Sequence, residues 1–481
     1  MNRYKLWIDG TSVDPSSGQW LDSFDPSNGK KWAEIPRANA VDASLAVAAA
    51  ERAMKGDWGT SSASERGRLM RSIADVITRN AEELCVLETR DNGKLLSEMH
   101  GQIRYISDYW HYFAGLADKI EGAVVPMQNT SLLAFTRHVP VGVVAALTAW
   151  NSPLMFFTIK CAPALAAGCA VVVKPSEFAS VSSLAVAALT KEAGLPDGVI
   201  NVVTGLGSEV GSPLVEHPDV AAVSFTGSDA TGLKVYEAAA RGMKRVHLEL
   251  GGKSPNIVFE DADLKLAAAG AVTGIFSAAG QMCTAGSRLL VQNSIKEAFT
   301  AELLSLARKV KVGSPLDLDT QMGPIATEPQ YRKVLEYIDI AKAEGATCAL
   351  GGAAVEVGGE GKGQFVAPTI FTDVTNEMRI AQEEVFGPVL SVIGFEDEVD
   401  AVKIANDIDF GLAAGVWTRD IGRGLRMSQA LDAGTVWINT YRAYSYALPF
   451  GGTKRSGIGR ESGIEAVHEF LETKSVMIST A

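Results

Sequence analysis

Cysteine is scarce in this chain, and none of its cysteines forms a CxxC pair. The 481 residues contain five: Cys85, Cys161, Cys169, Cys283 and Cys348. An odd number of widely spaced cysteines argues against a disulfide framework and against a structural zinc site. We therefore expect reduced thiols and no metal centre.

The chain also lacks a basic excess, a long apolar run and a targeting segment. It has 44 basic and 56 acidic side chains, a formal net charge of −12, and no basic cluster that could follow a phosphate backbone. Its longest apolar stretches, such as residues 141–149 and 162–173, are shorter than the roughly 20 residues that span a bilayer. The first residues have the pattern of neither a secretory signal nor a transit peptide. We expect no nucleic-acid partner, no membrane partner and a cytoplasmic location.

The sequence predicts an α/β architecture, because short β-branched runs alternate with alanine-rich amphipathic segments. In the first half this pattern predicts a doubly wound unit with strands at 143–147, 170–173, 199–203 and 220–224 and helices at 183–193 and 232–241. A second series follows Gly251-Gly252. It has predicted helices at 264–279 and 294–310 and strands near 287–291, 390–395 and 434–439, which indicates a second α/β domain.

Cys283 is the candidate nucleophile. It lies in Gly280-Gln281-Met282-Cys283-Thr284-Ala285-Gly286, where small neighbours leave a thiol accessible. An isolated cysteine is more often an inert core residue, so this assignment depends on other segments.

Two predicted strand ends carry polar residues suited to a ligand, because open α/β sheets bind ligands at the carboxyl ends of their strands. Asn151 follows the strand at 143–147 and could donate to an oxyanion, although an ordinary turn residue would look the same. Lys174 and Glu177 follow the next strand. They suit a ribose, and the carboxylate favours NAD over NADP, whereas the ordinary alternative is an exposed ion pair.

Two further segments suit a dinucleotide and a base. Gly227 and Ser228 stand between a strand and a helix, where a helix N-terminus attracts pyrophosphate, although Ser228 could be a plain N-cap. Glu249 lies between two leucines, so partial desolvation should raise its pKa towards that of a general base. A surface glutamate at a strand end is the alternative.

Taken in order, seven segments resemble the aldehyde dehydrogenase superfamily from about Trp7 to the last residues. They are AWNSP, VVKPSE, FTGS, LELGGKSPN, GQMCTAGSR, EEVFGPV and PFGGTKRSGIGRE. The resemblance implies that Cys283 attacks an aldehyde, that Asn151 and the Cys283 backbone N–H hold the oxyanion, and that Glu249 activates the water that releases the acid. It also places Lys160, Thr226 and Glu461 in a proton relay, although Lys160 could be a solvated helix residue.

The resemblance implies NAD as cofactor, in preference to NADP. The matching contact positions are Trp150, Lys174, Ser176, Glu177, Gly227, Ser228, Leu250, Gly251, Glu384 and Phe386. It further implies a Rossmann-type cofactor domain at 1–120 and 141–251, a catalytic domain at 252–465, and a small β oligomerisation arm at 121–140 and 466–481. Because an isolated hairpin leaves open strand edges, the arm predicts a homodimer or homotetramer.

Two features bear on the aldehyde. Many relatives have an aromatic residue at the position of Ser152, so the smaller side chain predicts a pocket for a bulky or polar substrate. The segment 441–448 should line the tunnel, where its three tyrosines and Arg442 could meet an aromatic ring or a carboxylate. Interface tyrosines would look the same. The candidate pocket residues are Ser152, Phe156, Met282, Thr284, Arg442 and Tyr444, of which Met282 and Phe156 could equally be packing.

Three alternatives stay open. A CoA-acylating aldehyde dehydrogenase would replace water by coenzyme A, which the presence of Glu249 disfavours. A thiol esterase could use Cys283 and Glu249 without a cofactor. A non-catalytic protein that keeps the fold is disfavoured because Cys283, Glu249 and Asn151 are all present.

Overall fold

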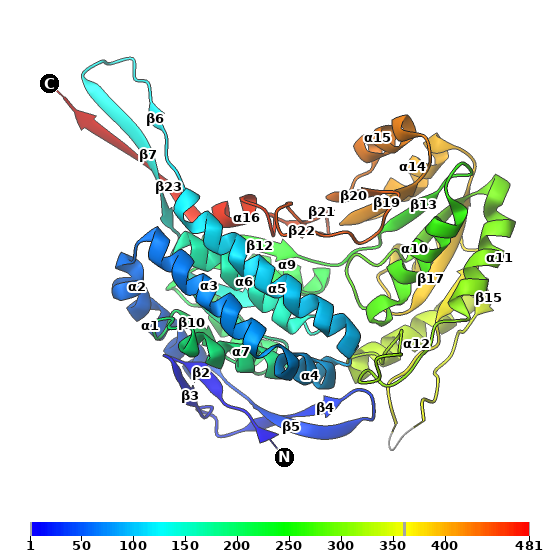
Figure 1. The fold of residues 1–481 in the computed structure, drawn as a ribbon, viewed down its shortest axis with the longest axis horizontal. Coiled ribbons are helices and arrows are strands. Elements are labelled where there is room, and N and C mark those ends of the chain that lie inside the picture. The colour runs from blue at the N-terminus through cyan, green and yellow to red at the C-terminus, as the bar shows by residue number, and fades with distance from the viewer. Residues whose placement is uncertain (1, 359–361, 481) are drawn as a thin grey trace.

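The computed structural model describes residues 2–358 and 362–480. Two sheets, each flanked by helices, form the body, and a narrow arm projects from it (Figure 1). The C-terminus lies at the end of this arm, and the N-terminus lies on the opposite side of the body. The expected α/β class is confirmed.

The first sheet has eight strands in the order β22-β12-β11-β8-β9-β10-β2-β3. The five strands from β12 to β10 are parallel, and the others run antiparallel at the two edges. Their bounds are β22 (Gly457–Ile458), β12 (Arg245–Glu249), β11 (Val220–Thr226), β8 (Val143–Leu147), β9 (Ala170–Lys174), β10 (Ile200–Val202), β2 (Leu6–Ile8) and β3 (Thr11–Val13).

Helices cover both faces of this sheet. Every residue of β8 is buried, and alternate residues enter different cores: Val144 and Ala146 join one cluster, and Val143 and Ala145 join the other. A strand buried on both sides explains the uninterrupted apolar run in the sequence. The covering helices are α1 (Ala40–Lys55), α2 (Asp57–Thr60), α3 (Ala63–Arg79), α4 (Ala81–Asn92), α5 (Leu96–Leu116), α6 (Pro153–Ala167), α7 (Val181–Glu192), α8 (Ser212–Glu216), α9 (Asp229–Arg241) and α16 (Glu465–His468).

The second sheet has seven strands in the order β15-β16-β17-β14-β13-β19-β20, and only the edge strand β15 is antiparallel. The strands are β15 (Thr347–Leu350), β16 (Thr369–Thr372), β17 (Val389–Phe395), β14 (Arg288–Gln292), β13 (Pro255–Val258), β19 (Ala413–Trp417) and β20 (Thr435–Ile438). The helices of this region are α10 (Leu264–Phe276), α11 (Lys296–Ala307), α12 (Glu328–Ala343), α13 (Arg379–Gln382), α14 (Glu398–Asn406) and α15 (Ile421–Ala430).

The predicted strands and helices are present in both halves, and two helices are shorter than predicted. The helix expected at 294–310 is α11 at 296–307. The helix expected at 264–279 ends at Phe276, because Ala278 and Ala279 have φ values of 51° and 52° and Gly280 has 71°. Three successive left-handed residues cannot continue a right-handed helix. They turn the chain just before Cys283.

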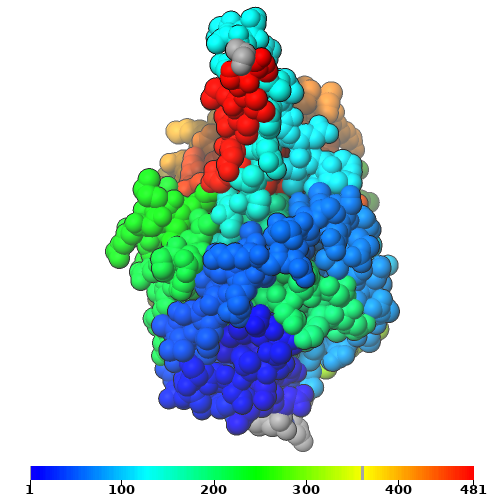
Figure 2. Space-filling view, turned by 90° about the vertical axis from the view of Figure 1, so that its left-hand side faces the viewer, coloured from blue at the N-terminus to red at the C-terminus, as the bar shows by residue number. Residues whose placement is uncertain are grey.

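The arm consists of β6 (Val124–Val125), β7 (Leu132–Pro140) and β23 (Leu471–Ser479). Strand β7 pairs antiparallel with the whole of β23, and the two strands lie side by side away from the body (Figure 2). Apolar side chains on it are left exposed, with Val124 74% and Met477 62% accessible.

Small sheets complete the fold: β1 (Asn2–Arg3), β4 (Trp20–Asp25) and β5 (Lys30–Pro36) form one, and β18 (Phe410–Gly411) and β21 (Thr453–Lys454) form the other. Within the described ranges, no helix has the length and apolar character needed to cross a bilayer, and no group of His, Cys, Asp and Glu side chains could hold a metal ion.

Candidate active site

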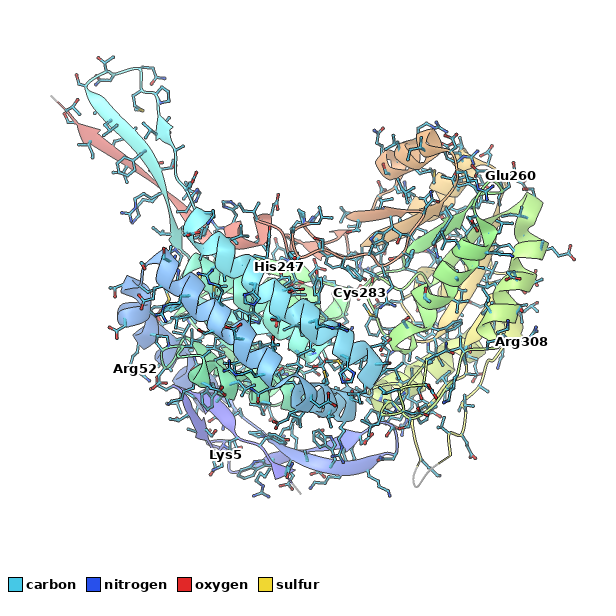
Figure 3. All side chains as sticks on the ribbon, viewed as in Figure 1. Lys5, Arg52, His247, Glu260, Cys283 and Arg308 are labelled. Atoms are coloured by element: carbon cyan, nitrogen blue, oxygen red, sulfur yellow. The ribbon has the colours of Figure 1, made fainter. Side chains whose placement is uncertain are left out.

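Cys283 lies on the loop between α10 and β14, near the middle of the molecule where the two main lobes meet (Figure 3). Gln281 fixes this loop, because its side chain donates to the carbonyls of Ala278 and Pro324 and accepts from the N–H of Ala326 at 2.8 Å. Cys283 is partly exposed, whereas Cys85, Cys161 and Cys169 are buried. The thiol is therefore both held in place and accessible.

Burial, together with the charges of Glu249, Glu384 and Glu461, raises the pKa of the Cys283 thiol. Although part of the residue surface is accessible, the charged groups that act most strongly on the thiol are acidic and disfavour a thiolate. The resting group is a protonated thiol, so nucleophilic attack requires a proton acceptor.

Asn151 follows β8, and its side chain reaches the Cys283 loop. Its Nδ2 donates to the carbonyl of Gln281 at 2.9 Å. A carboxamide nitrogen carries two hydrogens, so one remains for a ligand oxygen beside the thiol.

Glu249 is the last residue of β12 and is only 4% exposed. Burial and the charge of Glu461 raise its pKa well above the ordinary value, while Lys160 and Arg460 act in the opposite direction. Its Oε1 has no hydrogen-bond partner among the described residues. The predicted desolvation of this carboxylate is confirmed. A carboxylate oxygen of raised pKa and without a hydrogen-bond partner is a stronger proton acceptor than an ordinary carboxylate.

A buried polar network stands behind Glu249. Lys160 of α6 donates to Glu461 and to Ser224 of β11, both at 3.0 Å. Ser224 in turn lies 3.2 Å from Nδ1 of His247, and Nε2 of His247 is 3.9 Å from Glu249 Oε1. The structure thus brings together Lys160 and Glu461, which the resemblance had linked, and Lys160 is not a solvated residue, since it is 1% exposed.

His247 was missed from the sequence. It stands two residues before Glu249 on the same strand and therefore on the same face. Burial and the charges of Lys160 and Arg460 lower its pKa well below the ordinary value, so the ring is neutral at pH 7. The period of two along the strand was the signal that could have found it.

Thr226 stands beside Glu249, because the two residues are partners in the parallel pairing of β11 with β12. Its Oγ1 is buried and has no hydrogen-bond partner in the described structure. It is adjacent to the base but is not bonded to the Lys160–Glu461 pair.

The expected cofactor residues gather at the carboxyl ends of the first sheet. Lys174 donates to Glu177 at 3.2 Å, Ser176 follows in the same loop, and burial lowers the pKa of Lys174. Ser228 caps α9 by accepting from the N–H of Thr231, so its N-cap geometry is established.

Close packing brings the other cofactor positions together. A Cβ on Gly251 would lie 2.5 Å from Glu384 Oε2, and one on Gly232 would lie 2.5 Å from a methyl of Leu250. Glu384 also accepts from Gly252 N–H at 2.9 Å, and burial raises its pKa to about 7. The rings of Trp150 and Phe386 meet edge to face at 5.4 Å.

On its other side the Cys283 loop contacts the segment 441–448. Tyr444 and Thr284 share a hydrogen bond of 2.5 Å between their hydroxyls, and Arg442 donates to the sulfur of Met282 at 2.9 Å. Ser152 is buried and accepts from the buried Lys94, which supports a polar contact at this position. Phe156 is partly exposed on α6.

A thiol, an amide donor and a buried carboxylate at the strand ends of a doubly wound sheet suit an enzyme that uses a cysteine nucleophile. The Aldehyde dehydrogenase family model matches residues 12–476. The chain belongs to the aldehyde dehydrogenase family.

Two relatives illustrate the likeness. An aldehyde dehydrogenase of Aspergillus niger is 45% identical over 472 residues, covering 98% of this chain and 94% of that protein. The structure of betaine aldehyde dehydrogenase from Staphylococcus aureus in complex with NAD+ is 43% identical, with a TM-score of 0.97 and coverage of 99% of this chain and 95% of that one.

Proposed function

We propose that this protein oxidises an aldehyde to a carboxylic acid with NAD and water. The overall reaction is RCHO + NAD+ + H2O to RCOOH + NADH + H+. The observation that carries the proposal is that the partly exposed Cys283 lies on the loop that the Asn151 amide contacts and within the electrostatic reach of the buried Glu249 carboxylate.

The residues present fit a dinucleotide. Gly251 leaves room that a Cβ would fill beside Glu384, and the capped N-terminus of α9 directs free N–H groups and a positive dipole end outward. Lys174 and Glu177 would hold the adenosine ribose, Ser228 the pyrophosphate, and Glu384 with Phe386 the nicotinamide side. Glu177 favours NAD because a carboxylate repels a 2′-phosphate.

In the first step the thiol proton passes to Glu249, and the sulfur adds to the aldehyde carbon. Asn151 Nδ2 and the Cys283 N–H donate to the oxyanion of the resulting thiohemiacetal. Bound NAD supplies the acceptor for the hydride that leaves this carbon.

The remaining thioester is hydrolysed in the second step. Glu249, once it has passed on the thiol proton, removes a proton from a water molecule, which attacks the thioester carbon. The C–S bond then breaks, the acid leaves, and the sulfur takes up the proton held by Glu249. Lys160 and Glu461, with Thr226 beside Glu249, are the groups through which the proton leaves. Because Glu249 serves as the base for water, the proposal favours hydrolysis over transfer to coenzyme A.

The side chains near the Cys283 loop support a substrate class. The buried Ser152 and the rings of Tyr444 and Phe450, whose centroids are 6.0 Å apart, suit a bulky, aromatic or polar aldehyde. The exposed apolar residues of the arm support a homodimer or homotetramer. The five free thiols are consistent with a cytoplasmic protein.

The test is the formation of NADH from NAD across aliphatic, aromatic and carboxylate-bearing aldehydes, with NADP run in parallel. The matched control is Cys283→Ser, for which we expect loss of oxidation and retained NAD binding. Ester hydrolysis without NAD-dependent turnover would instead identify a thiol esterase, and turnover that needs coenzyme A would identify the acylating reaction. Full activity of Cys283→Ser would remove the thiol from the mechanism.

A further inference from the structure

Arg442 is a cation with few acceptors beside the nucleophile. Its guanidinium donates to the sulfur of Met282 at 2.9 Å and to the carbonyl of Thr273 at 3.3 Å, and its Nε is buried with no partner in the described structure. A thioether is a weak acceptor, and a guanidinium has five N–H donors. The hydroxyl of Tyr444 also hydrogen-bonds with this guanidinium. The partners of Arg442 in the described structure are therefore all neutral, and its Nε N–H has none.

Other arginines of the chain are better matched. Arg288, which is also buried, donates to four oxygens at 2.8–3.0 Å. Arg245 forms a two-point pair with Glu472, and Arg423 binds Asp261. None of the ion pairs within the described ranges includes Arg442, so the site itself does not neutralise it.

Surrounding contacts hold Arg442 against the neighbour of the reacting group. Arg442 has a φ of 59°, an unfavourable value for a residue other than glycine that persists only where surrounding contacts fix it. Its contact residue Met282 immediately precedes Cys283, while Tyr444 binds Thr284, which immediately follows Cys283. The two side chains thus flank the nucleophile.

Lys94 is another cation near Arg442, and acidic side chains neutralise its charge. The charge of Arg442 repels that of Lys94, but the carboxylates of Glu88 and Glu98 attract it. Glu88 lies 4.0 Å from the Nζ of Lys94, and this amine donates a hydrogen bond to Gln102 at 2.7 Å. Burial lowers the pKa of Lys94 further. Of these two cations, Arg442 is the one without an acidic partner in the described structure.

Aromatic side chains cluster around the segment 441–448. Tyr444 contacts Trp437 at 5.7 Å between ring centroids, and Tyr446 contacts Tyr105 at 5.8 Å. Although 42% of Tyr444 is exposed, its hydroxyl end is enclosed, and burial raises its pKa while Arg442 acts in the opposite direction. Flat apolar walls leading past a guanidinium suit an aldehyde with an apolar body and an anionic end.

We infer that the aldehyde taken by this site carries a carboxylate at the end remote from its carbonyl, bound by the guanidinium of Arg442, which has no acidic partner in the described structure. Guanidinium and carboxylate can form two parallel hydrogen bonds, the strongest pairing open to such a group. An aldehyde with a quaternary ammonium end would meet repulsion at the same place. The inference rests on the proposed function and names its substrate class.

The experiment compares three aldehydes with the same body and different charge: 4-formylbenzoate, its methyl ester, and the 4-trimethylammonium benzaldehyde. NADH formation gives kcat/KM for each. For the unmodified protein we expect the carboxylate to exceed the ester at least about 10-fold and the cation to be the poorest substrate. The shorter pair 4-oxobutanoate and methyl 4-oxobutanoate repeats the comparison at a second length.

Arg442→Gln should lower the carboxylate-to-ester ratio by about 10- to 100-fold, and Arg442→Lys should lower it less. The matched control is Arg419→Gln, which removes an equal charge from a side chain that is 73% exposed and should leave the ratio unchanged. If Arg442→Gln does not fold, the ratios of the unmodified protein and of Arg442→Lys decide the question.

Equal kcat/KM for carboxylate and ester at both lengths would overturn the inference while leaving aldehyde oxidation intact. A preference for the cationic aldehyde would also overturn it. The absence of NADH with every aldehyde would instead contradict the proposed function itself, and the inference would fall with it.

Discussion

The two sides of Cys283 differ in how their charges are matched. On the side of the first sheet, Glu249, His247, Lys160 and Glu461 are at most 5% exposed, and Lys160 is bonded to both Ser224 and Glu461. On the side of the segment 441–448, Arg442 is only partly buried and has no acidic partner among the residues described.

This difference separates chemistry from selectivity. Buried groups at fixed distances set the pKa of the base, because each charge acts on Glu249 with little screening by water. A partly exposed cation without a partner does little for the pKa of the base but can bind an anionic ligand. Changes on the buried side should therefore alter rate and pH dependence, whereas changes at the mouth should alter the choice of substrate.

The largest effect is expected for Glu249→Gln. The amide cannot accept a proton, so steady-state turnover should fall by about 10²- to 10⁴-fold, the usual contribution of a general base. Stopped-flow measurement of NADH formation should show an early phase, slowed by loss of the proton acceptor for the thiol, before the slow steady state. A steady-state rate like that of the unmodified protein would exclude Glu249 as the base.

The next effect is a pair of opposite pH shifts. Activity needs the ionised Glu249, so the rate should rise with pH through its raised pKa. Lys160 lowers that pKa and Glu461 raises it. Lys160→Met should therefore move the rising limb to higher pH, and Glu461→Gln should move it to lower pH, each by about one unit. The pH dependence of kcat tests the pair.

Each of these variants leaves a buried charge without its partner, at a cost of about 3–5 kcal/mol in folding stability. Thermal unfolding should accompany the kinetic measurements, and the double variant Lys160→Met with Glu461→Gln serves as the control that removes both charges. Shifts of the same sign in the two single variants would contradict the electrostatic explanation.

A smaller effect is expected for His247→Asn. Burial and the neighbouring cations lower the His247 pKa, so the ring is neutral where the enzyme works. Removing a neutral group should lower kcat by less than about 10-fold and should not shift the pH at which kcat rises. A limb displaced by a full unit would mean that His247 is charged in the active protein.

The smallest effect, at the mouth, is expected for Ser152→Phe. The larger ring would narrow the opening and remove the hydroxyl that accepts from Lys94. We expect KM for aromatic aldehydes to rise about 3- to 10-fold, with a smaller change for a short aliphatic aldehyde. Equal changes for both substrates would show that Ser152 does not shape the pocket.

The sequence predicted the elements whose pattern is local. The strand at 143–147 could be predicted because both of its faces are buried and every residue is apolar, and the cap of α9 could be predicted because Ser228 stands at a strand-to-helix turn. The base could be anticipated because Glu249 stands between two leucines. The arm and the relay came from the family resemblance alone.

What could not be predicted depends on contacts between distant parts of the chain. Lys160 and Glu461 are 301 residues apart, and Arg442 and Met282 are 160 apart. The early end of α10 was missed because alanine favours helix, and only Gly280 signals the left-handed turn at Ala278 and Ala279. The contact of His247 with Ser224 could not be predicted either, because it depends on the pairing of β11 with β12.

The most direct test of the account is the mass of the protein trapped during turnover. Glu249→Gln is mixed with NAD and an aldehyde that the unmodified protein oxidises, quenched in acid, digested and examined by mass spectrometry. We expect an acyl group of the substrate's mass minus one hydrogen on the peptide containing Cys283, and none when Cys283 is also changed to Ser. An unmodified Cys283 peptide in a sample that has formed one equivalent of NADH would contradict the thioester mechanism.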